Sequence, residues 1–378
     1  MHRGVRELVR WLEDHKADPG VALQPPARAN DVQALEHDLG SPLPDDLRLV
    51  LGRFNGATLP GGAILLTAAP GPGTTIEAVL KELAAQRNVS FLDPDLFLPF
   101  GKTEHGTVLA FDRSAAPIAD TWPVVDFDLE SGEINITHRT FDGWCRLSVG
   151  EWGADDRDAP FSLDKYLRSG GRHADIEPDI SIAHVTVGHA LRRAGEPERA
   201  LAAYVKGGRC MPPIAWSDWE GLKLAVILED WRAAQEVGGR LTKRSRKDTW
   251  ERRGTTPSRV AFLIARAMRK AAHDDEERAL WLRMLDHVSH QALDEEDGAA
   301  LIAICAAARD PDAPIPLPSP AQAPALELDD DVDIAFAQMR EAYTAGQLRD
   351  DDLALDPRYE VVTGSYPLAE ILKIRREF

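Results

Sequence analysis

The chain has 378 residues, 62 of them acidic and 44 basic, and a formal net charge of −18. Since this length can bury more than one hydrophobic core, we expect two domains. The acidic excess argues against a general affinity for nucleic acid, whose phosphates would repel the chain, and it is compatible with a basic partner.

Three amphipathic helices are predicted at the start of the chain. Apolar side chains recur at spacings of three and four residues over 6–13, 30–39 and 45–54, which places them on one face of each helix. The pair Asn55-Gly56 tolerates positive φ, so the third helix can stop sharply and lead into a strand over 63–66. A fourth helix is expected over 76–87.

Polar residues, glycine and proline mark the ends of the second and third helices. We expect Asn30 or Asp31 to cap the second helix, because a side-chain oxygen there accepts a hydrogen bond from a free backbone N–H. Gly40 then ends this helix. Pro44 bars simple continuation, and Asp46 lies near the positive end of the next helix dipole. These residues are therefore expected to shape the backbone.

Short strands follow these helices. The segments 97–100 and 105–112 predict a strand pair, and 123–128 predicts a strand that turns at Ser131-Gly132 and returns over 134–137. A helix is expected to begin at Phe141. Residues 161–169 predict the last helix of this domain, which we expect to end at Gly170-Gly171.

Four of these pieces, in the same order, resemble the SUKH superfamily of Smi/Knr-like domains. They are the pattern LG..LP.D....L...NG over 39–56, the strand pair over 97–112, the PVVDFD strand at 123–128 and the TFDGW helix start at 140–144. The signature positions are Leu43, Pro44, Asp46, Asn55, Gly56, Gly106, Asp112 and Phe141. The resemblance implies an α+β domain over residues 1–172, with a mixed, mainly antiparallel sheet and flanking helices.

After residue 175 the composition changes to alanine, leucine and arginine with a helical period. The run 182–212 resembles a tetratricopeptide repeat, with Gly188 where its two helices meet and Ala200 on the second helix. Ala234 repeats the position of Ala200 after 34 residues, which is the period of that repeat class. We therefore expect an all-α, helical-repeat-like domain over 175–308.

The remaining residues predict a linker and a tail. Residues 309–325 are rich in proline, which cannot pair into a sheet, so we expect an extended linker. The tail, 326–378, opens with acids and predicts a helix over 334–343 and a small terminal helix within 359–378. Its apolar residues favour docking on one of the domains, and a free interaction tail is the alternative.

Motifs for catalysis, cofactors and metals are weak throughout the sequence. It contains neither a Gly-x-Ser-x-Gly nucleophile elbow nor a phosphate loop with its lysine. His287 and His290 stand three apart on a predicted helix, with no third ligand in evident reach. We therefore predict a protein that is not an enzyme, with no catalytic residue, no cofactor and no metal site.

Acids and tryptophans are the candidates for contact with a protein partner. The candidate residues are Trp122, Asp126, Asp128, Glu130, Trp216 and Trp219. The three acids have a spacing like that of a calcium loop, but the glycine falls one position late and Thr137 replaces the final Glu, so a hairpin with outward-facing acids is expected. Each tryptophan is an interface hot spot where it is exposed and a core residue where it is buried.

Three further features bear on compartment and partner. No run of about eighteen apolar residues and no signal-peptide pattern occurs, so we expect neither membrane spanning nor secretion. Cys145, Cys210 and Cys305 are far apart and odd in number, which fits reduced thiols in a cytoplasmic protein. The basic cluster within 243–253 predicts a solvated loop or a contact for an acidic partner.

Three functions remain open at this point. The family resemblance implies an immunity protein that binds and neutralises a cognate bacterial toxin, and the acidic balance suits a basic toxin such as a nuclease. A regulatory or scaffold adaptor, closer to fungal family members implicated in cell-wall signalling, gains weight from the helical domain. An enzyme of unrecognised type has no motif in its favour.

Overall fold

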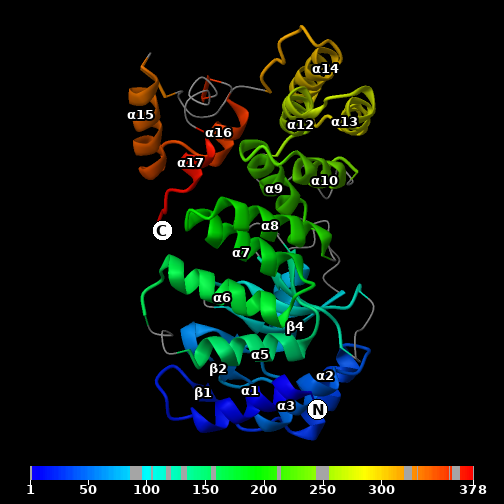
Figure 1. Ribbon diagram of the computed structural model, residues 1–378. Coiled ribbons are helices and arrows are strands. Elements are labelled where there is room, and N and C mark those ends of the chain that lie inside the picture. The colour runs from blue at the N-terminus through cyan, green and yellow to red at the C-terminus, as the bar shows by residue number, and fades with distance from the viewer. Residues whose placement is uncertain are drawn as a thin grey trace. The chain divides into compact units, whose positions relative to one another are not determined.

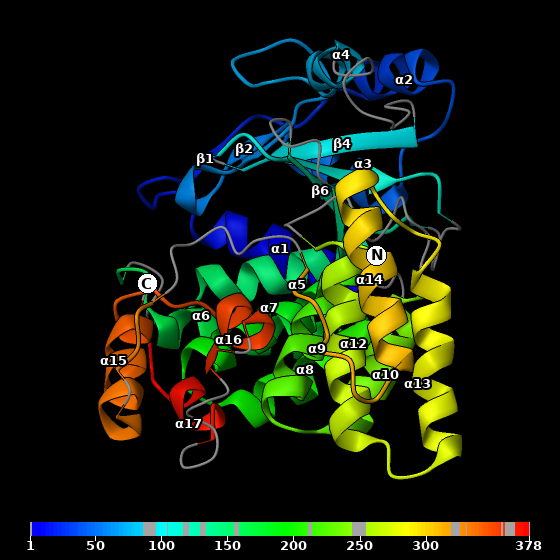
Figure 2. The ribbon, with the colours of Figure 1, turned by 90° about the horizontal axis from the view of Figure 1, so that it is seen from above.

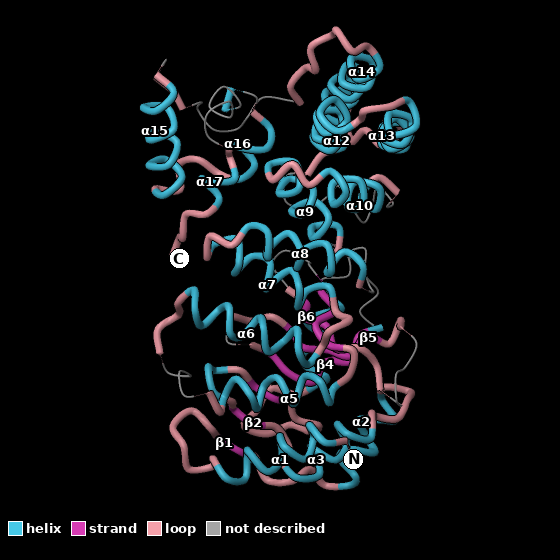
Figure 3. The backbone as a smooth tube through the Cα atoms, viewed as in Figure 1, coloured by secondary structure: helices cyan, strands magenta, loops and turns pink. Residues whose placement is uncertain are grey.

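A computed structural model describes most of the chain as two compact units. The described residues are 2–85, 96–103, 105–115, 121–128, 134–154, 159–210, 214–243, 255–318, 326–329, 331–356, 358–359 and 367–377. Unit 1 comprises residues 1–160 and 171–182, and unit 2 comprises residues 161–170 and 183–378. The strands drawn in Figure 3 belong to unit 1, whereas helices occur in both units.

Unit 1 is built on an antiparallel sheet in which each strand pairs with the next strand along the chain. In the described residues its strands are β1 (Ala22–Leu23), β2 (Ala57–Thr58), β3 (Ile64–Leu65), β4 (Phe97–Lys102), β5 (Val108–Asp112), β6 (Val124–Phe127) and β7 (Ile134–His138). The long strands β4 and β5 are almost entirely buried, because side chains from both faces of the sheet are covered. The predicted pairing of 123–128 with 134–137 is present as β6 and β7, and the turn at Ser131-Gly132 lies outside the described residues.

Helices cover both faces of this sheet. They are α1 (Arg3–Asp14), α2 (Ala29–Asp38), α3 (Asp45–Arg53), α4 (Ile76–Ala85) and α5 (Phe141–Trp152). In Figure 2 the sheet lies between α4 on one side and α1 with α5 on the other. Phe100, Phe111 and Phe141 meet inside with ring centroids 5.0 to 5.4 Å apart, and Trp144 completes the cluster. This aromatic cluster joins β4 and β5 to the start of α5.

Two predicted helix ends are wrong. The residue that precedes α2 is Arg28, which provides no side-chain cap. The cap position thus lies two or three residues before the predicted Asn30 or Asp31, and Asp31 lies in the first turn of the helix. A carboxylate there still interacts favourably with the helix dipole. Helix α6 (Leu163–Ile176) runs through Gly170 and Gly171. A Cβ at Gly170 would lie 3.1 Å from Thr186 Cγ2, so this glycine permits close helix packing and does not end the helix.

Unit 2 is all-helical in its described residues. Its main helices are α7 (Ser181–Arg193), α8 (Pro197–Arg209), α9 (Ala215–Ile227), α10 (Trp231–Leu241), α12 (Pro257–Ala271), α13 (Asp275–Val288) and α14 (Glu295–Arg309). Consecutive helices pack against one another as hairpins, as Figure 1 shows for α8 to α10 and α12 to α14. With unit 1, this arrangement confirms the predicted fold class of an α+β domain followed by an all-α domain.

The tail docks in unit 2. It contains α15 (Val332–Thr344), α16 (Asp350–Leu355) and α17 (Ala369–Leu372). Met339, Tyr343, Leu353 and Ile371 are fully buried and share one core with the helices from α8 to α14. The structure therefore decides between the docked tail and the free tail in favour of the first.

The predicted terminal helix is much shorter than expected. Only the four residues of α17 are α-helical in the described part of 359–378, and residues 374–377 lie beyond the helix. The reason is tertiary, because the backbone there pairs with the end of α7. Arg192 Nη1 donates to the Leu372 carbonyl at 3.0 Å, and the Arg376 N–H donates to the Arg193 carbonyl at 2.8 Å.

Candidate functional site

The signature residues of the helix-break-helix segment are engaged inside unit 1. The Leu43 N–H donates to Glu36 Oε1 at 2.8 Å, which fixes the break, while Pro44 precedes α3 directly. Asp46 is buried, with its carboxylate 2.5 Å from His2 Nδ1. These contacts hold the first helices together and leave little of the motif to meet a partner.

The remaining signature residues also form hydrogen bonds, turns or core contacts within unit 1. Asn55 Oδ1 accepts from the Ala68 N–H at 2.7 Å, and Gly56 has a φ of 92° that a side chain would strain. Gly106, with a φ of 85°, forms the turn before β5. Asp112 Oδ1 accepts hydrogen bonds from the backbone and hydroxyl of Ser114. Phe141 belongs to the aromatic cluster, so the whole signature serves the fold.

The predicted acidic surface maps to β6 and its flanks. Trp122 directly precedes the strand pair, Asp126 lies within β6, and Asp128 follows its last residue. Residues two apart on a strand share a face, so the two acids point to the same side of the sheet. Both acids and Trp122 are half-buried, which is less exposed than the predicted outward-facing hairpin. Glu130 lies outside the described residues.

The two other candidate tryptophans, Trp216 and Trp219, are on α9 in unit 2, whereas the candidate acids Asp126 and Asp128 belong to unit 1. Trp219 is 2% exposed and belongs to the core, where it offers no surface to a partner, so the structural interpretation of this residue holds. Trp216 is half-buried, and its Nε1–H donates to Glu220 Oε1 at 3.0 Å. Its ring also lies 4.5 Å from that of His189.

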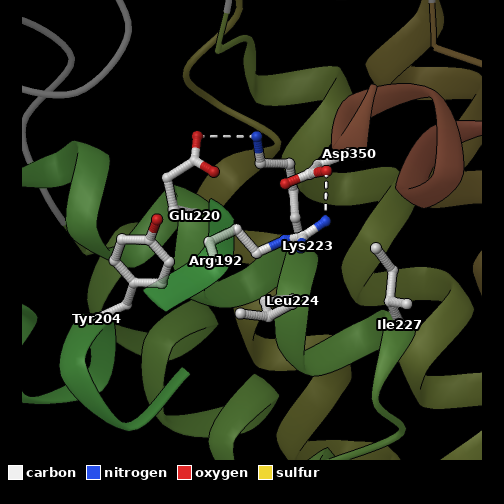
Figure 4. Close-up of a pocket in the computed structure, with 7 residues that line it drawn as sticks. All are labelled: Arg192, Tyr204, Glu220, Lys223, Leu224, Ile227 and Asp350. Atoms are coloured by element: carbon white, nitrogen blue, oxygen red, sulfur yellow. Dashed lines mark hydrogen bonds and ion pairs between the residues drawn. The ribbon is translucent and has the colours of Figure 1, made fainter. Parts of the chain in front are cut away.

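Unit 2 contains a charged pocket that sequence patterns did not indicate. The charged pocket is lined by Arg192, Tyr204, Glu220, Lys223, Leu224, Ile227 and Asp350 (Figure 4). Lys223 Nζ lies 2.8 Å from Glu220 Oε1 and also pairs with Asp351. Arg192 Nη2 lies 2.6 Å from Asp350 Oδ1. The pocket thus joins α7, α8 and α9 to the first turn of α16.

Ionisation in the charged pocket is set by burial and by neighbouring charges. Burial opposes the charged form of Asp350, but Arg192, Arg376 and Lys223 outweigh it and lower the pKa of this carboxyl. Burial also works against the Lys223 ammonium, yet Glu220 and Asp351 raise its pKa. Arg192 and Asp350 are therefore an ionised pair. Lys223 is charged, whereas burial raises the pKa of Glu220 against the effect of Lys223. One available signal was Lys223 itself, because a lysine inside the apolar run of α9 requires a buried partner.

A second buried titratable group lies in unit 1, where Glu177 follows α6. Its side chain sits against Gly143 in the first turn of α5, at a place where a Cβ would overlap the carboxylate. Burial raises the pKa of Glu177 to about 7, against the opposing effects of the Arg139 backbone N–H and the Arg139 and Arg146 charges. His138 lies in the same region, with its ring centroid 4.9 Å from that of His173. Burial and His173 lower the pKa of His138.

We expect Glu177→Gln to stabilise the protein strongly at pH 8 and only slightly at pH 5. A raised folded pKa means that the protonated acid contributes stability fully below the ordinary value of 4.5 and loses it as the pH rises to about 7. Glutamine mimics the neutral acid at every pH. Urea midpoints of the wild type and the variant at both pH values measure the effect. The titration of His138 contributes equally to both proteins and so cancels in their difference. An equal effect at pH 5 and pH 8, or the same pH dependence in the exposed control Glu13→Gln, would contradict this prediction.

In the described residues, no group of three or more His, Cys, Asp or Glu side chains is arranged to hold a metal ion. His287 Nδ1 lies 2.6 Å from the Arg283 carbonyl. Within the same residues, no helix combines the length and apolar character needed to cross a membrane. Cys145, Cys210 and Cys305 are buried, and none of the three is in a disulfide.

The described residues form an α+β domain that carries the signature, followed by a helical unit. Residues 26–146 match the model of the SMI1 / KNR4 family (SUKH-1). This match confirms the SUKH domain at the N-terminus and covers neither the helical unit nor the tail. SUKH domains generally bind protein partners, and SUKH-1 domains are commonly immunity proteins in toxin systems. No curated protein matches the chain in a sequence comparison.

Proposed function

We propose that this protein is a cytoplasmic, non-catalytic binding module whose SUKH domain binds and neutralises a cognate bacterial toxin. The observation that carries the proposal is the SUKH-1 match over 26–146, on residues that form the sheet and helices of unit 1. The signature side chains of this domain are used inside the fold. Partner contact therefore falls to other surface residues of unit 1.

The expected partner is a basic protein. The chain carries a net charge of −18, and such an excess steers basic partners toward it at low salt. On unit 1, Asp126 and Asp128 share one face, and Trp122 precedes the same strand in the chain, so this segment contains both negative charge and an aromatic side chain. Complementary charges of this kind contribute specificity and association rate more than affinity.

A role without catalysis is supported by the state of the nucleophilic groups. Burial raises the pKa of the Cys145 thiol well above its ordinary value, and burial likewise raises that of Cys305. The thiolate is the reactive form of cysteine, so both residues are poor nucleophiles. The charged pocket consists of paired cations and anions whose partners are internal.

The test is neutralisation of a toxin encoded beside this gene. We expect Asp126→Asn with Asp128→Asn to weaken binding of the purified toxin by the full chain about tenfold, mainly through slower association. Surface plasmon resonance at low and moderate salt measures both rates, and growth during co-expression reports protection. The matched control is Glu13→Gln with Asp14→Asn, which removes two exposed charges at the end of α1. Equal effects of the two double variants would reject the β6 surface, and absence of toxin binding by the wild type would reject the immunity function.

The second candidate function is an adaptor, and the helical unit favours it. Two of its helix pairs have a glycine at the contact: a Cβ at Gly188 would lie 2.6 Å from the Tyr204 ring, and a Cβ at Gly221, 33 residues later, would lie 3.3 Å from Val237. This spacing supports the proposal of a helical repeat. Small residues at such positions allow paired helices to pack closely. A single-domain inhibitor has no need of this unit. An isolated gene, with no toxin gene beside it, would favour the adaptor.

A further inference from the structure

The first turn of α16 is bound by buried cations of other helices. Arg192 at the end of α7 and Lys223 on α9 each have a side chain only 5% exposed. Their partners are Asp350 and Asp351, the first two residues of α16. The two pairs join positions 158 and 128 residues apart in the chain. A short acidic helix start is thus held by the charged pocket.

The charges balance only while α16 is in place. Three cations, Arg192, Lys223 and Arg376, face three anions, Glu220, Asp350 and Asp351. Without the tail, α7 and α9 would keep Arg192, Lys223 and Glu220, which leaves a net charge of +1. This face is therefore basic on a chain whose net charge is −18. Two buried cations need carboxylate partners, because an unpaired buried charge is strongly destabilising.

Backbone contacts add a second element to this recognition. Arg192 donates to the Leu372 carbonyl, and Arg266 of α12 donates to the Ala354 carbonyl in α16. Gly195, in the turn between α7 and α8, has a φ of 77° and no room for a Cβ, which would overlap the Lys373 carbonyl. These contacts involve backbone atoms of the tail, so they do not depend on the identity of its side chains. The side-chain requirement at the face of α7 and α9 is therefore a pair of carboxylates at the start of a helix.

We propose that the charged pocket and the adjoining face of α7 and α9 form a binding surface for acidic, helix-starting protein segments, which residues 348–356 occupy as an intramolecular ligand. A partner segment with two consecutive carboxylates at the start of a helix competes for the same cations. The tail thereby controls access to the helical unit. This proposal does not depend on the toxin-binding function assigned to the SUKH domain.

The apolar anchors of the tail determine how the competition must be measured. Tyr343, Leu353 and Ile371 are fully buried, so they keep the wild-type tail docked against a competing peptide. Removal of the α16 carboxylates leaves Arg192 and Lys223 buried with fewer partners, which disfavours the docked state specifically. Undocking returns both cations to water, where an external acidic peptide can reach them.

The test uses the full chain and a labelled peptide with the sequence of residues 348–356, LRDDDLALD. We expect the variant Asp350→Asn with Asp351→Asn to bind this peptide at least tenfold more tightly than the wild type does, measured by fluorescence anisotropy. Binding should weaken as salt increases, because it depends on charge pairs. A peptide with asparagine in place of its first three aspartates, which correspond to Asp350, Asp351 and Asp352, should not bind. The control variant, Glu327→Gln with Glu341→Gln, removes two exposed charges from the same tail and should behave as the wild type.

Equal peptide binding by the double variant and the wild type, with the helical circular dichroism signal retained, overturns the proposal. If the double variant loses that signal, the single variant Arg376→Ala tests the proposal in its place. Arg376 stacks on the Tyr343 ring at 4.0 Å and lies 3.6 Å from Asp350, so its removal loosens the tail without changing Arg192 or Lys223. Faster amide hydrogen exchange over 348–356 together with tighter peptide binding supports the proposal. The proposal is rejected if neither hydrogen exchange nor peptide binding changes, or if exchange becomes faster without tighter peptide binding.

Discussion

Asp218→Ala is expected to destabilise the helical unit by about 3–5 kcal/mol, which is the usual cost of removing one partner of a buried ion pair. The Asp218 side chain is 0% exposed. Its Oδ1 accepts from Arg240 Nη2 at 2.7 Å and from Arg240 Nε at 2.9 Å. Because Asp218 is on α9 and Arg240 on α10, the substitution removes a link between two helices and leaves a cation partly buried. Urea unfolding followed by circular dichroism at 222 nm measures the loss.

The neighbouring Glu236 provides the matched control for Asp218. It pairs with Arg209 Nε at 2.6 Å and with Arg240 Nη1 at 2.5 Å, but its side chain is 32% exposed. Solvent screens such a pair, so Glu236→Gln should cost less than about 1 kcal/mol. Equal losses for Asp218→Ala and Glu236→Gln would show that burial does not determine the strength of this network. Partial recovery in Asp218→Ala with Arg240→Met would attribute the loss to the charge of Arg240, which then keeps only Glu236 as an acidic partner among the described residues.

Gly188→Ala is the second substitution with a large expected effect, a loss of about 1–3 kcal/mol through overpacking. The new Cβ would lie 2.6 Å from Cε1 and 2.7 Å from Cδ1 of Tyr204, whose ring is 1% exposed and surrounded by core side chains. Since the ring has little space to move, α7 and α8 must separate. The urea midpoint of unfolding should fall, and amide hydrogen exchange in both helices should become faster.

Gly239 on α10 separates this packing effect from the general effect of replacing glycine in a helix. A Cβ at Gly239 would meet only Met284 Cε, at 3.8 Å, which is an ordinary contact. Gly239→Ala should therefore gain up to about 1 kcal/mol from helix propensity. If Gly188→Ala also stabilises the protein, the contact between Gly188 and Tyr204 does not restrict this helix pair.

Local patterns predicted most helices and strands because these elements depend on nearby residues. The three- and four-residue spacing over 45–54 predicted α3, and the pair Asn55-Gly56 predicted its sharp end, where Gly56 has a φ of 92°. The helix over 6–13 and the strands around Gly106 were predicted in the same way. Composition alone also separated the α+β unit from the helical one.

Several local interpretations failed where a distant neighbour decides the structure. Gly170-Gly171 was predicted to end a helix, yet α6 continues through both, because the first glycine makes room for Thr186. The terminal helix is confined to α17, because residues beyond it bond to Arg192 and Arg193. Trp219 was a candidate for partner contact or for the core, and the packing of α9 against α8 and α10 decides for the core.

The sequence by itself determined the domain types, the SUKH signature and the acidic character of the chain, since periodicity, turn residues and charge are local or additive properties. Only the tertiary structure decided that the tail docks and that Asp350 and Asp351 meet Arg192 and Lys223. The physical reason is that an ion pair depends on which helices are brought together. A lysine in an apolar run indicates that an acidic partner is needed, but only the tertiary structure shows which carboxylate lies beside it.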